Sequence, residues 1–129
     1  MAVRRKYVKK AGTTIVAIQL DLETAGFTYS KWGGTQTCKR GDWLVNNDGD
    51  VYTIDRDTFA RTYRLESPGL FRKVAPVWAE VAQRSGAIKT KEGVTHYSAG
   101  AYLVFNDPEG QDGYAVEAPS FEAMYEPIE

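Results

Sequence analysis

The acid with the most suggestive surroundings is Asp42, which lies between Gly41 and Trp43. A carboxylate beside an indole ring can bind a base or a sugar, with the ring as a stacking platform. Alternatively, Gly41 forms a tight turn and Asp42 accepts hydrogen bonds from nearby backbone amides. We favour this second interpretation, because a related segment later in the chain carries Ala101 where the first carries the acid.

His96 is the only histidine and Cys38 is the only cysteine. This pair cannot build a zinc site, and a single cysteine cannot form an intramolecular disulfide. His96 could act as a general base, but no nucleophile lies at a recognisable spacing, so we expect an ordinary strand residue. Cys38 precedes Lys39 and Arg40, which would favour a reactive thiolate; we nevertheless interpret it as a packed, structural cysteine.

The segment around Gly49 superficially resembles an EF-hand calcium loop, with Asn46, Asp48 and Asp55 as oxygen donors. If Gly49 takes the sixth loop position, Leu44 falls at the first position, where an acid is required. A β-hairpin explains Asp48-Gly49 without a metal. The chain has no P-loop, GxGxxG, GxSxG, HExxH or CxxC motif. We therefore predict no metal and no cofactor.

The charges are distributed unevenly along the chain. Residues 1–91 hold all 16 basic residues and nine acids, a net charge of +7, whereas residues 92–129 hold eight acids and no base, a net charge of −8. This pattern indicates either a basic face for an anionic partner or two oppositely charged lobes that face each other in one fold. We favour the second interpretation.

The basic start of the chain offers a possible nucleic-acid surface, together with the bases and aromatics of residues 29–40. The sequence pI of about 5.9 is low for such a domain. Basic residues along an exposed edge strand also prevent edge-to-edge pairing, and we prefer that interpretation. The basic residues at the start are Arg4, Arg5, Lys6, Lys9 and Lys10, and those of the second segment are Lys31, Lys39 and Arg40, with Tyr29 and Trp32.

The size and composition are those of a globular protein. A chain of 129 residues with 43% hydrophobic residues makes about one domain or two very small ones. No apolar stretch approaches the ~20 residues that span a bilayer, and the basic start leads into no apolar region typical of a signal peptide. We therefore predict a cytoplasmic protein without membrane contact.

An internal repeat organises the elements that must position these residues. Residues 34–48 align with 93–107, and residues 51–63 align with 113–125, with nine identities in the 28 pairs. The shared residues are glycines, aromatics and strand aliphatics. The matched positions include Gly41 with Gly100, Trp43 with Tyr102, Tyr52 with Tyr114, Phe59 with Phe121, Tyr63 with Tyr125, and Tyr7-Val8-Lys9-Lys10 with Phe71-Arg72-Lys73-Val74.

We therefore predict two copies, 1–66 and 67–129, joined by the turn-forming Ser67-Pro68-Gly69. Each copy begins with a strand, near 13–20 and near 75–82; the second segment could instead start a helix, but the repeat favours a strand. Residues 21–26 are expected to form a connection or one helical turn, and residues 27–32 a half-buried strand.

A hairpin and a helix complete each copy. The hairpins are expected at 42–46 with 51–54 and at 101–105 with 113–117. Asp55 is expected to cap a helix over 56–64, in which Asp57 pairs with Arg61, and Pro119 suits the first turn of the second helix. A unit of about 60 residues buries a marginal core, so the copies are expected to share one core around a pseudo-two-fold axis or to pair across a dimer. The fold class is α+β and β-dominated.

The first copy resembles the "PGDYG"-type proteins, small bacterial and phage or prophage proteins. The resemblance rests on Arg40-Gly41-Asp42-Trp43-Leu44-Val45, then Gly49, Tyr52, Ile54, Phe59 and Tyr63, with Tyr7-Val8-Lys9-Lys10 and Val16-Ala17-Ile18-Gln19 as the opening strand. Arg40 replaces the usual proline, and Ala101 replaces the acid in the second copy. The resemblance implies a bacterial or phage origin and an accessory function, and it indicates no particular reaction.

These observations favour a non-enzymatic binding or interaction module for an unknown protein or small ligand, in a monomer or a homodimer. We expect a pocket between the copies, with Asp42, Trp43, Tyr52, Tyr102 and Tyr114 as candidate ligand-binding residues. The first alternative is a small enzyme for a nucleotide-like ligand, with Asp42 or His96 as acid or base. The second is a weak nucleic-acid binder that uses the basic N-terminus.

Overall fold

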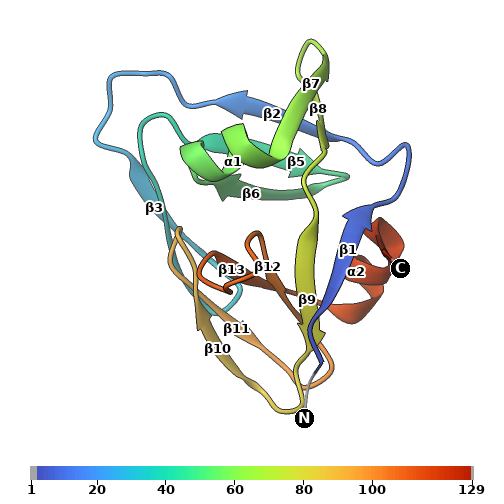
Figure 1. Ribbon diagram of the computed structural model, residues 1–129. Helices are drawn as coiled ribbons and strands as arrows, with labels where there is room; N and C mark the ends of the chain where they lie inside the picture. The colour runs from blue at the N-terminus through green and yellow to red at the C-terminus, as the bar shows by residue number, and fades with distance from the viewer. Residues whose placement is uncertain (1–2, 129) are drawn as a thin grey trace.

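The computed structural model describes residues 3–128, in which antiparallel strands dominate. Strands account for 51% of these described residues and two short helices for 11%. The strands form two five-stranded sheets and two separate hairpins, and the two helices lie apart from each other, one beside each five-stranded sheet (Figure 1). The expected β-dominated fold is confirmed at this level.

The first sheet has the strand order β6-β5-β2-β8-β7. Its β5–β6 hairpin turns at Asp48-Gly49, where both residues have positive φ (52° and 95°). A two-residue turn with both residues in this region is the type that matches strand twist, which explains the Asp-Gly pair. The strands are β2 (Ile15–Gln19), β5 (Trp43–Asn47), β6 (Asp50–Ile54), β7 (Tyr63–Ser67) and β8 (Leu70–Lys73).

The second sheet has the order β13-β12-β9-β1-β14. Its central strand β9 pairs with β12 on one side and with β1 on the other. Residues 77–81 thus form a strand, not the helix that their composition also allowed. The strands are β1 (Arg5–Lys9), β9 (Val77–Val81), β12 (Tyr102–Phe105), β13 (Gly113–Val116) and β14 (Tyr125–Pro127).

Strand pairing crosses the expected boundary between residues 66 and 67 in both directions. β1, near the start of the chain, pairs with β9 and β14. β8, which follows the boundary, pairs with β2 and β7. Ser67 ends β7, and Pro68-Gly69 form the turn of the β7–β8 hairpin, so the expected linker joins two strands of one sheet. The units 1–66 and 67–129 therefore do not each correspond to one sheet, and their status as copies stays a prediction.

The basic strand β1 is an interior strand, because it has a hydrogen-bonded neighbour on each side. The expectation that its lysines and arginines protect an exposed edge was wrong. Sequence patterning identifies a strand but not its position in a sheet, since that position depends on partners far along the chain.

Two hairpins extend beside the sheets: β3 (Phe27–Lys31) with β4 (Gly34–Cys38), and β10 (Gly86–Lys89) with β11 (Val94–Tyr97). They meet at Gln36, whose Nε2 donates to the Val94 carbonyl at 2.6 Å. Residues 21–26 form neither strand nor helix. The strand over 27–31 is more exposed than expected, and the Phe27 side chain is 46% exposed.

Each helix is followed directly by an edge strand of one sheet: α1 (Arg56–Thr62) by β7 and α2 (Ala118–Met124) by β14. The Asp55 side chain caps α1 by accepting from the Asp57 and Thr58 amides. The helix ends two residues earlier than expected, because Tyr63 already belongs to β7. The expected Asp57–Arg61 pair does not form; the Arg61 guanidinium instead lies 3.4 Å from the Asp112 carboxylate, a longer-range partner.

Each sheet packs on its own apolar cluster. In the first, Phe59 stacks on Tyr63 at 4.6 Å and on Trp43 at 4.0 Å. In the second, Phe121 stacks on Tyr125 at 4.7 Å and on Tyr102 at 4.2 Å. The cluster cores are Ile15, Ala17, Val45, Phe59 and Tyr63, and Val77, Ala79, Val104, Phe121 and Tyr125. The apolar interior is thus divided in two.

Candidate functional site

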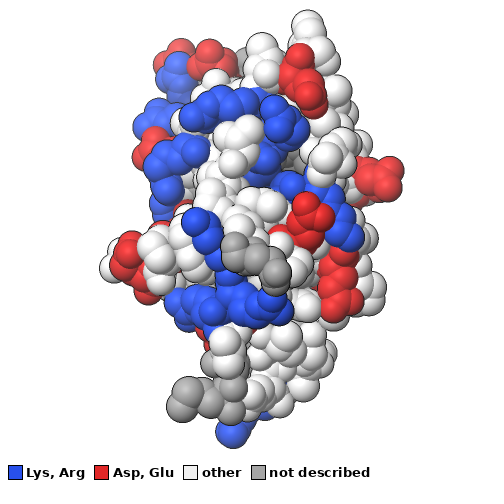
Figure 2. Space-filling view, turned by 45° about the vertical axis from the view of Figure 1, so that its right-hand side comes forward, with Lys and Arg blue, Asp and Glu red and all other residues white. Residues whose placement is uncertain are grey.

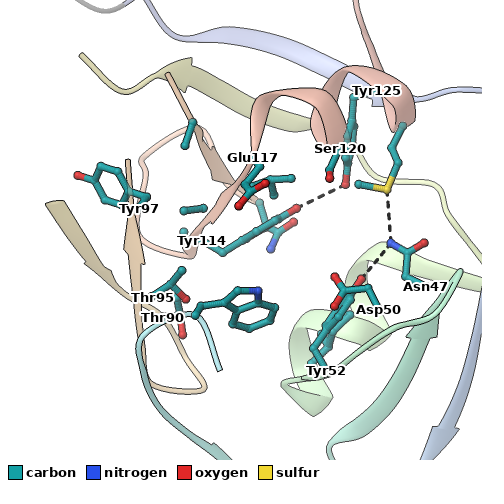
Figure 3. Close-up of a pocket in the computed structure, with 18 of the residues that line it drawn as sticks. Asn47, Asp50, Tyr52, Thr90, Thr95, Tyr97, Tyr114, Glu117, Ser120 and Tyr125 are labelled. Carbon is teal, nitrogen blue, oxygen red and sulfur yellow. Dashed lines mark hydrogen bonds between the residues drawn. The ribbon is translucent and has the colours of Figure 1, made fainter. Parts of the chain in front are cut away.

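Between the two clusters lies a cavity of about 740 Å³. Both sheets, the helices and the β10–β11 hairpin contribute to its wall (Figure 3). Its lining combines aromatic rings with polar and charged groups, an arrangement typical of small-ligand sites. The polar lining residues include Lys9, Asn47, Tyr52, Tyr63, Lys73, Glu92, His96, Asn106, Asp112, Tyr114 and Tyr125.

Five tyrosines line the cavity, and four of them, Tyr52, Tyr63, Tyr114 and Tyr125, belong to the two apolar clusters or pack against them. The hydroxyls of Tyr114 and Tyr125 lie 3.4 Å apart, and the Asn47 amide donates to the Tyr52 hydroxyl at 3.3 Å (Figure 3). Burial raises the pKa of Tyr52 to about 12 and holds the pKa of Tyr63, Tyr114 and Tyr125 well above the usual value. All four therefore stay protonated near neutral pH and can donate hydrogen bonds.

Lys73, the last residue of β8, is the most unusual charged group of the site. Its side chain is only 7% exposed. Its Nζ donates to the Asn106 side-chain oxygen at 2.9 Å and to the Tyr114 hydroxyl at 3.1 Å. Burial, reinforced by the charge of Lys9 and opposed by that of Asp112, lowers its pKa to about 7.

Lys9, the last residue of β1, is the second amine of the cavity. Its Nζ lies 3.6 Å from the Met124 sulfur and 5.2 Å from the centre of the Tyr125 ring. Burial lowers its pKa to about 8. Among residues 3–128, no carboxylate lies within 4 Å of the Nζ of Lys9 or Lys73. Two amino groups thus line the cavity without a counter-ion.

Acidic groups occupy another part of the wall. Glu92 accepts a hydrogen bond from the Asp55 amide at 2.7 Å, and burial raises its pKa to about 7. Asp112 accepts from the Thr58 hydroxyl at 2.9 Å and lies 3.9 Å from the Lys91 amine. The side chain of Asn106 links this group to Lys73, because its amide also contacts Asp112 at 3.5 Å. The site has a cationic and an acidic region.

His96 and Trp32 contribute to the outer wall. The Trp32 ring lies 5.8 Å from that of Tyr52. The His96 amide donates to the Trp32 carbonyl at 2.8 Å, and its ring lies over Gly33, where an added Cβ would come within 3.1 Å of it. His96 lines the cavity while Asp42 does not, so these two candidates for acid and base do not share one site.

Asp42 is buried, and its carboxylate accepts hydrogen bonds from backbone amides. Its carboxylate accepts from the amides of Lys39 (2.9 Å) and Arg56 (3.0 Å), and its exposed area is 1%. The Lys39 amine lies 3.1 Å away. These contacts are those of the structural interpretation: the carboxylate holds the turn before β5 against the first residue of α1.

We expect Asp42→Ala to lower the free energy of unfolding by about 2–3 kcal/mol, because the amides of Lys39 and Arg56 lose the buried carboxylate that accepts their hydrogen bonds. Chemical denaturation measures this loss. Asp57→Ala, at an exposed position, is the matched control and is expected to change stability by less than ~1 kcal/mol. A variant Asp42→Ala as stable as the wild type would contradict the structural role.

The candidate binding residues divide into two groups. Tyr52 and Tyr114 line the cavity. Trp43 is packed between Phe59 and Phe71, and Tyr102 stacks on Phe121 and donates to Glu122 at 2.9 Å. Neither Trp43 nor Tyr102 lines the cavity. The structure thus brings together two of the five candidates.

Sequence reasoning missed Lys9, Lys73, Tyr63 and Tyr125 as site residues. The repeat already aligned Lys9 with Lys73 and Tyr63 with Tyr125, but these matches were interpreted as strand and helix packing. The sequence contained one signal, which is that a lysine recurs at matched positions, 9 and 73, of two strand segments. Because lysine is rarely buried, this recurrence was unusual for positions interpreted as packed.

The basic residues of the N-terminus do not form one surface with those of residues 29–40. β1 and β3 lie on opposite sides of the molecule (Figure 1). On the face shown in Figure 2, basic side chains form bands interrupted by neutral and acidic ones. Arg4 pairs with Glu80 at 2.8 Å, and Lys6 packs over Trp78. The nucleic-acid hypothesis stays a prediction.

Fold and site together define an antiparallel β protein with an interior ligand-sized cavity. Within residues 3–128, no cluster of three or more His, Cys, Asp or Glu side chains is placed to hold a metal. Neither helix of that range has the length and apolar character needed to cross a membrane. Comparisons with protein-family models, curated proteins and solved structures gave no match to this chain.

Proposed function

We propose that the protein is a non-enzymatic binding module that takes a small anionic organic molecule into the cavity between its two sheets. The observation that carries this proposal is the pair of amines, Lys9 and Lys73, at the cavity wall, with no carboxylate of residues 3–128 within 4 Å of either. A buried charge is costly unless an opposite charge accompanies it. An anionic ligand would supply that charge.

The size and lining of the cavity support a ligand larger than an inorganic ion. Small-molecule sites usually measure ~300–1,000 Å³, and the cavity of about 740 Å³ falls within this range. The rings of Tyr52, Tyr63, Tyr114 and Tyr125 favour a planar or aromatic portion. Glu92 and Asp112 favour hydrogen-bond donors on another part of the ligand.

Binding of an anion should be accompanied by proton uptake. In the free protein, the pKa values of about 7 and about 8 leave Lys73 and Lys9 partly neutral near pH 7–8. A bound anion favours the charged form of each amine and raises both pKa values. The apparent affinity for an anion should therefore fall as the pH rises from ~7 to ~9.

The direct test uses anilinonaphthalene sulfonate, a fluorescent aromatic anion, and phenylnaphthylamine, which has the same rings without the sulfonate. We expect the sulfonate to bind native protein with one-to-one stoichiometry. The variant Lys9→Met/Lys73→Met should bind it roughly tenfold or more weakly, a loss of at least ~1.4 kcal/mol. Binding of phenylnaphthylamine should change little, because the ring contacts remain.

Lys89→Met, which removes an exposed strand lysine, is the matched control and should bind both probes as the wild type does. Circular dichroism verifies that each variant is folded. Equal affinity of the sulfonate for the wild type and for the double lysine variant would contradict the proposal.

We further infer that the chain arose by duplication, with one strand exchanged between the copies. The orders β6-β5-β2-β8-β7 and β13-β12-β9-β1-β14 support this inference, since matching segments occupy matching places. Lys9 faces Tyr125 in the register of β1 and β14, as Lys73 faces Tyr63 in that of β8 and β7. The two amines would then be pseudo-two-fold equivalents.

The PGDYG-type resemblance, the bacterial or phage origin and the cytoplasmic location remain predictions.

A further inference from the structure

We propose that Lys73 captures its ligand covalently as an imine, so that the occupant of the cavity is an anionic aldehyde or ketone. This inference rests on the binding function proposed above and adds the reacting atom and the ligand class. It is carried by the position of the Lys73 amine: at the cavity wall, nearly excluded from bulk water, and hydrogen-bonded only to neutral groups among the described residues.

The surroundings of this amine suit nucleophilic attack. The Nζ of Lys73 is held between the Asn106 oxygen at 2.9 Å and the Tyr114 hydroxyl at 3.1 Å. A lysine desolvated in a pocket and close to a second cation is the setting in which enzymes and carriers activate an amine. The pKa of about 7 means that roughly half of the amine is neutral at pH 7, about a thousandfold more than for an ordinary lysine.

Formation of the imine needs no oxidant and no reductant. The lone pair of Nζ attacks the carbonyl carbon, the electrons of the C=O bond move to oxygen, and a proton passes from nitrogen to that oxygen to give a carbinolamine. The C–O bond then breaks as the hydroxyl leaves with a proton, and nitrogen loses its remaining proton. The products are one imine and one water.

Tyr114 is placed to move those protons. Its hydroxyl contacts the reacting nitrogen and lies 3.4 Å from the Tyr125 hydroxyl. Because burial keeps the pKa of Tyr114 far above neutral, the phenol holds its proton and can donate it to the departing hydroxyl. The Asn106 oxygen accepts an N–H hydrogen bond, which orients the lone pair of the amine.

The second amine of the cavity, that of Lys9, indicates that the ligand carries an anionic group. The Nζ atoms of Lys9 and Lys73 lie 5.2 Å and 5.9 Å from the centre of the same ring, that of Tyr125. The separation of the two Nζ atoms therefore cannot exceed the sum of these distances, and we expect the ligand to carry its phosphate or carboxylate group within that distance of its carbonyl carbon. The titratable groups around Lys73 are Lys9, Asp112, Tyr63, Tyr114 and Tyr125.

Pyridoxal phosphate, an aromatic aldehyde with an anionic group, is a suitable probe. The protein is incubated with it at about pH 7, treated with borohydride to fix any imine, and digested for peptide mass analysis. We expect Lys73 to be labelled at least tenfold faster than any other lysine. Its labelling rate should be half-maximal near pH 7, whereas other lysines should react faster only as the pH rises toward ~10.

Three variants refine the test. Lys73→Met should lose the rapid labelling, Lys9→Met should slow it roughly tenfold, and Lys89→Met should leave it unchanged. Deoxypyridoxine phosphate, which lacks the aldehyde, should protect Lys73 in the wild type. This competition needs no variant, so it remains informative if a substitution perturbs folding.

The outcomes separate the two proposals. Rapid, protectable labelling at Lys73 supports both. Uniform labelling of lysines together with binding of deoxypyridoxine phosphate that Lys9→Met/Lys73→Met abolishes would overturn the imine and leave the anion site intact. Uniform labelling without such binding, combined with no loss of sulfonate-probe affinity in the double variant, would overturn both.

Discussion

Lys73→Met is expected to stabilise the ligand-free protein, raising the free energy of unfolding by about 2 kcal/mol at about pH 6. The folded chain holds the Lys73 amine at a pKa of about 7, against 10.5 when unfolded. This difference corresponds to roughly 5 kcal/mol of cost for the buried charge. The hydrogen bonds to Asn106 and Tyr114, which the methionine loses, offset part of the gain.

The pH dependence follows from the direction of the shift. Below pH 7 the amine is protonated in both states, and the folded state bears the full cost. As the pH rises from about 7 to 10.5, the folded state loses its proton first, so wild-type stability increases. The stability of Lys73→Met should rise less over this range, so its advantage of about 2 kcal/mol should vanish near about pH 8.5 and become a deficit of about 1 kcal/mol at about pH 9.5. Denaturant titrations at both pH values measure this.

Two control variants separate Lys73 from other groups. Lys89→Met should change stability by less than ~0.5 kcal/mol at either pH. Glu92→Gln tests the contribution of the buried carboxyl group. The pKa of Glu92 is raised from 4.5 to about 7 in the folded protein, so the stability of the wild type falls as the pH rises between these values. Glu92→Gln should remove that fall without altering the rise above pH 7. A less stable Lys73→Met at about pH 6 would show that the amine contributes more through its hydrogen bonds than it costs.

Phe121→Ala is expected to destabilise the whole molecule by about 3–5 kcal/mol. The ring is 1% exposed, stacks on Tyr102 and Tyr125, and meets Tyr7 edge-on at 4.9 Å. Phe27→Ala, which truncates a ring that is 46% exposed, is the matched control with an expected loss below ~1 kcal/mol.

The effect should also reach the other sheet. Strand β1 comes from the first half of the chain but pairs in the second sheet, and β8 comes from the second half but pairs in the first sheet. Unfolding of either sheet therefore disturbs chain segments that adjoin the other sheet. A protein with Trp32→Phe and Trp78→Phe retains Trp43 as a reporter of the first cluster. Phe121→Ala in this background should lower the Trp43 unfolding midpoint as much as it lowers the circular dichroism midpoint. An unchanged Trp43 midpoint would show that the sheets unfold independently.

Elements that depend on near neighbours could be predicted from the sequence. The turn at Asp48-Gly49 needs two residues that tolerate positive φ, and the cap at Asp55 needs only amides within three residues. Pro119 likewise lies in the first turn of α2, where a missing amide costs nothing. Tyr52 and Tyr114 were predicted because they are matched aromatic residues of the two expected hairpins.

Interactions that depend on distant partners were predicted poorly. Arg61 has Asp57 at helical spacing yet contacts Asp112, because the fold places the segment before β13, which carries Asp112, beside α1. Trp43 and Asp42 look like a ligand-binding pair in the sequence, but each is used by the fold: the ring in the core and the carboxylate at a helix start.

The sequence by itself determined the hairpins β5–β6 and β12–β13, the turn at Asp48-Gly49 and the starts of both helices, since these follow from local sterics and hydrogen bonding. Only the tertiary structure decided that β1 is an interior strand, that β8 lies beside β2, and that Lys9 and Lys73 line one cavity. A lysine at the end of a strand is an ordinary surface residue unless distant segments cover it. Here strand pairing across the whole chain excludes water from both amines, and that exclusion lowers their pKa values.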